Sequence, residues 1–338
     1  MKKTIIAVLA LASVVACNKS EVLETTPAEA ITFGSPFIEN STKAIDPSHP
    51  AVELAGFNVY GTVAYNGNVT NIFNGVEVSK TTTTNQGDAA STGGNYGYAT
   101  DKTQYWVEGN TYDFAAIAGA TAATTDGNGM PATIEYTDNQ TDILYAHDAY
   151  GVYNKPQTGS VASVKFTFDH LLSLVKFTFT NAYAQNTGFG IKVTDVTINN
   201  PYASATYTIA DQTWADHTSA TTPLAFGNAT ADDAAAGAVA LQLAYNEKAS
   251  SNYQRLMIPG TYEKLLVSFK VEVIAKDSND NDFTIDSNTY TDVEVLNVTF
   301  TPGYSYNLTA NVTEELDAIT FTVEKINAWT PSTPTEIL

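Results

Sequence analysis

The chain has 338 residues, of which 36 are Asp or Glu and only 16 are Lys or Arg, so its formal net charge is −20. This acidity argues against nucleic acid and anionic membrane surfaces as partners, because both repel negative charge. The length is sufficient for two domains. The abundance of Thr, Tyr, Val and Phe, with only 15% charged residues, is typical of β-sheet proteins. A single cysteine excludes an internal disulfide, so the fold must rely on its core.

The first residues predict an exported protein. Lys2 and Lys3 precede an apolar run over residues 5–16, which is too short to span a bilayer. A basic start followed by a short apolar run is typical of a secretory signal peptide. The run ends in Ala16 followed by Cys17, and a small residue before cysteine is what lipoprotein signal peptidase recognises. We therefore expect residues 1–16 to be a lipoprotein signal peptide and Cys17 to carry acyl chains that anchor the protein in the outer membrane. The alternative is an ordinary signal peptide with a stray buried cysteine.

After a polar tether over residues 17–28, strand patterns dominate the chain. Apolar residues alternate with polar ones in several runs, which predicts antiparallel sheets with one buried and one solvated face. These runs are residues 164–168, 175–179, 265–273, 304–312 and 319–323. An Ala-rich stretch at residues 229–244 could carry a short helix.

The predicted organisation is all-β, with two antiparallel β-sandwich domains in tandem. Residues 154–160 interrupt the strand patterns with Asn, Pro, Gly and Ser, which favours a boundary there. We expect an N-terminal sandwich over residues 29–158 and a C-terminal sandwich over residues 159–338.

Motifs for catalysis or metal binding are not found. The four histidines have no metal-ligand spacing, and neither a serine-nucleophile elbow nor a phosphate-binding Gly-rich loop occurs. His170 could pair with Asp169, but a structural role is the better interpretation. Three aspartates at positions 277, 280 and 282 resemble a calcium loop only superficially, and a solvated hairpin tip is favoured. We therefore expect no enzyme activity, no cofactor and no metal.

An aromatic cluster has two interpretations. Trp106 and Tyr105, with Tyr96 and Tyr98 nearby, could form a platform on which sugar rings stack. Aromatic residues are also ordinary members of half-buried strands, and packing in the core is the favoured interpretation.

Short segments in a fixed order along the chain resemble the fimbrillin (fimbrillin-like) family of Bacteroidales, the lipoprotein pilins of type V pili. Each segment is short, and their order across nearly the whole chain carries the resemblance. The segments are residues 31–33, 41–44, 105–114, 141–146, 168–175, 256–259, 300–306 and 326–329.

The resemblance implies assembly rather than catalysis. Family members consist of two transthyretin-like β-sandwich domains and reach the outer membrane as lipidated precursors. An extracellular trypsin-like protease removes the anchor and the first strand, and the groove left behind accepts a strand from another subunit. Here the candidate inserted first strand contains Ile31 and Phe33, and the candidate cut lies between Lys43 and Ala44. Lysine replaces the arginine that is commoner in the family, so Lys43 is either a cleavage site or a plain surface residue.

The candidate donor strand is residues 318–329. Ile319, Phe321 and Val323 would fill alternate pockets of a neighbour, or else complete this chain's own C-terminal sandwich. The leading hypothesis is a fimbrial subunit at the cell surface that binds other pilin subunits and supports adhesion. The alternative is a non-polymerising surface lipoprotein that binds glycans or host ligands, and a secreted hydrolase has no supporting motif.

Overall fold

The computed structural model describes residues 29–38, 54–80, 96–154, 156, 161–182, 189–231, 247–279, 281–313, 316 and 319–326. Within these ranges the chain is built from β-strands, with a single 3-10 turn, η1 (Thr100–Lys102), as the only helical element. The all-β prediction is therefore confirmed. No helix in the described ranges is long and apolar enough to cross a membrane. Of the Ala-rich stretch, residues 229–231 form a strand, and the rest of it lies outside the described residues.

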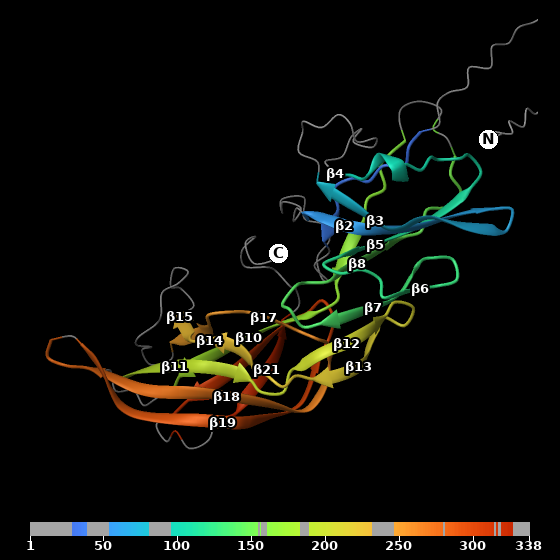
Figure 1. Cartoon of the computed structure of the whole chain (residues 1–338). Coiled ribbons are helices and arrows are strands. Elements are labelled where there is room, and N and C mark those ends of the chain that lie inside the picture. Colours follow the sequence, from blue (N-terminus) through green and yellow to red (C-terminus); the bar gives the residue numbers. More distant parts are fainter. Residues whose placement is uncertain are drawn as a thin grey trace, which may run out of the picture.

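The first half of the chain forms a seven-stranded sheet at the top of Figure 1. We call this sheet and its core, built from the described residues within the ranges 29–154 and 161–170, the N-terminal unit. Its strands, in spatial order, are β1 (Phe37–Ile38), β9 (Thr167–His170), β8 (Leu144–Asp148), β5 (Thr111–Ala118), β2 (Gly56–Tyr65), β3 (Asn68–Lys80) and β4 (Tyr96–Gly97). Residues 161–170 pack with this unit although they follow the predicted linker. The division of the chain into two domains stays a prediction.

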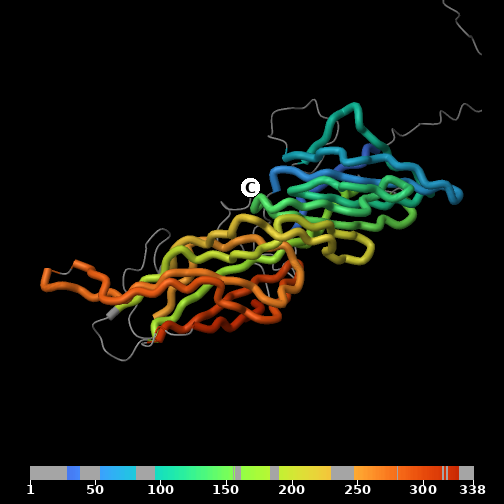
Figure 2. The backbone as a smooth tube through the Cα atoms, turned by 60° about the horizontal axis from the view of Figure 1, so that its bottom comes forward, coloured from blue at the N-terminus to red at the C-terminus, as the bar shows by residue number. Residues whose placement is uncertain are grey.

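The second half forms two sheets that enclose a second core, and we call it the C-terminal unit (residues 173–326). Alternation in the sequence explains this core, because Leu265, Val267, Phe269, Val271 and Val273 all point inward and are at most 1% exposed. One sheet contains β15 (Ala229–Ala231), β16 (Lys248–Ser251), β10 (Ser173–Asn181), β20 (Ser305–Val312) and β21 (Phe321–Ile326), with β17 (Arg255–Met257) also paired to β10. The other contains β14 (Leu224–Gly227), β11 (Phe189–Ile198), β18 (Gly260–Lys276) and β19 (Asp282–Phe300). The β18–β19 hairpin extends away from the N-terminal unit (Figure 2).

A small sheet joins the two units. It consists of β13 (Thr213–Ser219), β12 (Tyr202–Thr208), β7 (Pro131–Thr137) and β6 (Thr124–Thr125), so that strands from both halves of the chain pair with each other (Figure 1). A third apolar cluster lies at this junction and includes Ile134, Leu172 and Ile258. The side-chain amide of Gln140 also bonds the main chain of Leu256 twice, donating to its carbonyl at 3.1 Å and accepting from its N–H at 2.9 Å.

Candidate functional site

Residues 29–38, which end in β1 and which we call the first strand, lie between two other segments and make main-chain hydrogen bonds with both. On one side it runs antiparallel to residues 104–106: the N–H of Ile31 donates to the carbonyl of Gln104 at 2.8 Å, and the N–H of Trp106 donates to that of Glu29 at 2.9 Å. On the other side it runs parallel to residues 164–168: the N–H of Gly34 donates to the carbonyl of Val164, and the N–H of Val164 donates to the carbonyl of Thr32, both at 2.8 Å. The strand therefore fills a gap between two neighbours.

The side chains of this strand fill the core of the N-terminal unit. Ile31 is 0% exposed and Phe33 is 1% exposed. Phe33 lies in ring contact with four other aromatic side chains at centroid distances of 5.5–6.2 Å, namely Phe73, Tyr98, Phe114 and Phe166. Both residues that we expected to anchor the first strand are thus buried, and without them the surrounding rings would face an open groove.

Polar groups fix the position of the strand in this groove. The Tyr98 hydroxyl donates to the carbonyl of Ile31 at 2.7 Å, and burial raises the pKa of this tyrosine. Thr32 and Ser163 share a hydroxyl–hydroxyl bond of 2.8 Å. The Glu29 carboxylate accepts a bond of 2.8 Å from the N–H of Val161. These contacts hold the first strand in one register relative to the segments on either side of it.

Sequence reasoning missed two components of this site. It placed residues 164–168 in the C-terminal domain, whereas they form one wall of the groove, and it did not single out Tyr98 as an anchor. No local signal distinguishes residues 164–168, because Val-Lys-Phe-Thr-Phe occurs there and again at residues 175–179 of β10.

Other predicted residues lie outside the described ranges. These are the expected lipid attachment point Cys17 and the candidate cleavage site Lys43 and Ala44. The first strand ends at Ile38 and the chain is next described at Leu54, so the candidate cut falls between the first strand and β2.

The candidate donor strand is placed at the edge of the chain's own C-terminal sheet. Strand β21 pairs antiparallel with β20. Ile319 is 6% exposed, while Phe321 and Val323 are half-buried and pack against the same core. In this arrangement the segment completes the sandwich of its own chain, and its donation to a neighbour stays a prediction.

The aromatic cluster near Trp106 belongs to the core. Trp106 is 4% exposed, Tyr96 and Tyr98 are equally buried, and Tyr105 alone is half exposed. The ring of Trp106 stacks on Tyr153 at 4.9 Å. The core interpretation is therefore confirmed, and these residues offer no open platform for a sugar.

The three histidines that the structure describes form polar contacts with neighbouring groups. His170 pairs through Nδ1 with Asp142 Oδ2 at 2.6 Å, and both side chains are almost fully buried, which agrees with the structural role favoured for this histidine. Exposed His147 lies 2.8 Å from Asp113. In the described part of the chain no group of three His, Cys, Asp or Glu side chains could hold a metal ion.

The hairpin tip between β18 and β19 is a hydrogen-bonded turn. Asp277 accepts bonds from the main-chain N–H groups of Asn279 and Asn281 at 2.8 and 2.9 Å, through a single carboxylate oxygen. Such self-contained bonding is typical of an Asx turn.

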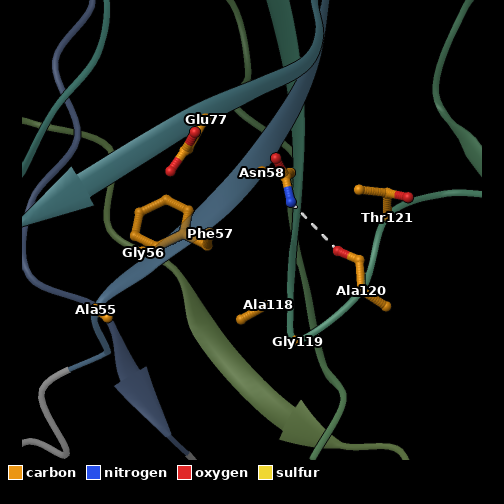
Figure 3. A pocket seen from close by; sticks show the side chains of 9 residues that line it. All are labelled: Ala55, Gly56, Phe57, Asn58, Glu77, Ala118, Gly119, Ala120 and Thr121. Atoms are coloured by element: carbon orange, nitrogen blue, oxygen red, sulfur yellow. Dashed lines mark hydrogen bonds between the residues drawn. The ribbon is translucent and has the colours of Figure 1, made fainter. Parts of the chain in front are cut away.

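A shallow depression of about 490 Å³ lies at the start of β2, beside the loop that follows β5 (Figure 3). Glu77 is the one titratable side chain in its lining, and Asn58 donates to the carbonyl of Ala120 at 3.3 Å across it. A lone carboxylate without a partner acid or base does not make a hydrolytic site.

Comparison with known proteins identifies what the chain is similar to. A family model described as fimbrillin-like matches residues 41–329. A crystal structure of a fimbrial protein from Bacteroides vulgatus is 17% identical, with a TM-score of 0.60, and covers 89% of this chain and 99% of its own. A crystal structure of a protein from Bacteroides ovatus, with a proposed role in cell adhesion, is 15% identical, with a TM-score of 0.50, and covers 91% of this chain and 100% of its own. At such identities these structures show the fold alone. A search of the curated proteins gives no match.

Proposed function

Because this chain belongs to the fimbrillin-like family, we propose that it is a structural subunit of a cell-surface fimbria, assembled by strand exchange and supporting adhesion. In this proposal the chain is exported as a lipoprotein precursor anchored through Cys17. A protease cuts after Lys43, and a strand from another subunit then replaces residues 29–38. The family suggests a structural protein rather than an enzyme.

The observation that carries the proposal is the position of the first strand. It has main-chain partners on both sides and apolar side chains in the core, but it is joined to β2 only through residues 39–53. A cut in that stretch leaves the strand attached by non-covalent contacts alone. Removal would expose several aromatic rings and two rows of unpaired main-chain groups, which are a template for a new strand.

The lipid anchor fits this order of events. Residues 17–28 connect Cys17 to the first strand, and twelve extended residues span about 40 Å at most. Cutting after Lys43 would separate the anchor and the first strand from the remainder of the chain in one step. The same event would therefore release the subunit from the membrane and open its groove.

Limited trypsin digestion of the purified precursor tests the proposal. We expect release of the residues up to Lys43 and, on an unboiled gel, a ladder of detergent-resistant oligomers. A Lys43→Gln precursor is the matched control and should remain intact at this site and monomeric. A chain that stays monomeric after complete loss of residues 29–38 would refute assembly by strand exchange.

The alternative is a non-polymerising lipoprotein that binds glycans. Its main candidate for a sugar-stacking residue was Trp106, and this ring is buried.

A further inference from the structure

Two tyrosines in one segment bond main-chain carbonyls on opposite sides of the candidate cut. Tyr96 lies in β4 and Tyr98 follows two residues later, and both side chains are buried in the core of the N-terminal unit. The Tyr96 hydroxyl donates to the carbonyl of Leu54 at 2.6 Å. The Tyr98 hydroxyl donates to the carbonyl of Ile31 at 2.7 Å. A cut after Lys43 would separate these two acceptors, because Leu54 stays with the groove and Ile31 leaves with the first strand.

The Tyr98 hydroxyl takes the place of a regular bond between two strands. Residues that form a hydrogen-bonded antiparallel pair exchange two main-chain bonds. Here the N–H of Ile31 donates to the carbonyl of Gln104 at 2.8 Å, whereas the carbonyl of Ile31 accepts from Tyr98. Burial raises the pKa of Tyr98, and a main-chain hydrogen bond from Gln104 to its hydroxyl offsets part of that rise. The hydroxyl therefore connects the first strand to the segment beside it.

The bond from Tyr98 recognises the main chain and not a side chain. Every residue of an extended strand has a carbonyl, so a strand of any sequence that fills the groove along the same path can accept this bond. The ring of Tyr98 contributes separately to the apolar pocket, because it packs against Phe33 and Phe73 at centroid distances of 5.7 and 5.6 Å. The ring thus selects apolar side chains, while the hydroxyl holds the backbone.

This bond has to break before the first strand can leave. Tyr98 is 4% exposed and Ile31 is 0% exposed, so water reaches neither group until the strand has begun to move out. A buried donor and a buried acceptor without partners are both unfavourable, which raises the barrier to release. A strand that enters the open groove regains the bond. Tyr96 adds nothing to this barrier, because its acceptor does not leave.

We propose that Tyr98 latches the exchangeable strand in the groove and thereby sets the rate of strand exchange. It holds residues 29–38 in the precursor, delays their release after a cut, and then donates the same bond to a carbonyl of the strand that replaces them. This inference rests on the proposed strand exchange and adds the residue that controls its rate. Tyr96 takes no part in the exchange.

Tyr98→Phe and Tyr96→Phe form a matched pair of variants that test this role. Each removes one buried hydroxyl from the same segment and keeps the aromatic ring in the core. We expect the two uncut precursors to lose similar amounts of Tm, because each loses one hydrogen bond to a main-chain carbonyl. A difference between the variants in the behaviour of the first strand then reports on the latch and not on general stability.

The rate at which the first strand leaves the cut chain is the first measurement. The unsubstituted precursor and both variants are cut with trypsin, and the protease is then inhibited. Size-exclusion chromatography with intact mass follows the fraction of each chain that still holds residues 29–38. We expect Tyr98→Phe to speed release by about tenfold, and Tyr96→Phe to stay within about twofold of the unsubstituted chain.

Hydrogen exchange of the uncut precursors is a second measurement that needs no cleavage. The N–H groups of Ile31 and Trp106 bond across the pairing of the first strand with residues 104–106, and they exchange when this strand opens locally. Tyr98→Phe should speed exchange at both groups by about tenfold, because the latch no longer opposes local opening. Tyr96→Phe should leave exchange at both groups unchanged.

The outcomes separate the latch from the proposed strand exchange. Oligomer ladders together with equal release rates for Tyr98→Phe and Tyr96→Phe would overturn the latch and leave strand exchange standing. The same holds for equal hydrogen exchange at the first strand in the two variants. A cut chain that forms no ladder would refute strand exchange and, with it, control of its rate by Tyr98.

Discussion

Replacing Phe33 by alanine tests whether the first strand is a structural part of the N-terminal core. The side chain is 1% exposed and touches four aromatic rings. Truncating a fully buried phenylalanine costs about 3–5 kcal/mol, and the lost ring contacts place this site toward the upper part of that range. We expect Phe33→Ala to lower the free energy of unfolding of the N-terminal unit by about 4 kcal/mol.

Calorimetry and urea denaturation of the precursor measure this loss. A decrease of about 4 kcal/mol corresponds to a fall in Tm of about 12 °C for a unit of this size. Phe37→Ala is the matched control, because Phe37 lies on the same strand but is 38% exposed, and it should cost less than about 1 kcal/mol. Equal effects of the two substitutions, or an unchanged Tm for Phe33→Ala, would show that the first strand does not occupy the groove in solution.

Three further predictions concern the rest of the chain. Asp142→Asn should destabilise the protein by about 3–5 kcal/mol in urea denaturation, because it removes the buried carboxylate that pairs with His170. Gln140→Ala should cost about 1–3 kcal/mol and should speed hydrogen exchange at β17, because two bonds between the units are lost. Burial raises the pKa of Tyr145 and of Tyr207 to about 12. The stability that their protonated forms contribute is therefore complete below pH 10 and is lost as the pH rises from 10 to 12. Alkaline unfolding, followed by tyrosinate absorbance, should occur in that pH range.

Each of these predictions has a contradicting result. His147→Ala removes an exposed pair and should cost less than about 1 kcal/mol, so a loss equal to that of Asp142→Asn would contradict the argument from burial. Unchanged exchange at β17 in Gln140→Ala would show that its amide does not hold the units together. Tyrosines that all ionise near pH 10 with the fold intact would show that Tyr145 and Tyr207 are not buried.

The strands could be predicted from the sequence where apolar and polar residues alternate strictly. Residues 265–273 lie in β18 and residues 305–312 form β20, with the alternating apolar positions buried, because a period of two places successive side chains on opposite faces of a sheet. The burial of Ile31 and Phe33 followed from the same logic together with the resemblance.

The pairing of strands distant in sequence could not be predicted in this way. Nothing local in residues 131–137 indicates that β7 pairs with β12 of the other unit, because such pairing depends on three-dimensional packing. For the same reason the pairing of residues 164–168 with the first strand could not be predicted, since their alternation is the same on either side of a boundary. The bond of His170 to Asp142, 28 residues away in sequence, could not be predicted either, because a buried pair depends on how strands meet.

The most direct test of the account is the mass of the subunits inside assembled oligomers. Detergent-resistant oligomers are isolated after trypsin treatment, dissociated by boiling and analysed by intact mass and N-terminal sequencing. The account predicts that every assembled subunit begins at Ala44 and that residues 29–38 are no longer bound. Oligomers whose subunits retain residues 29–38 in the groove would contradict it, because two strands cannot occupy the same place in the core.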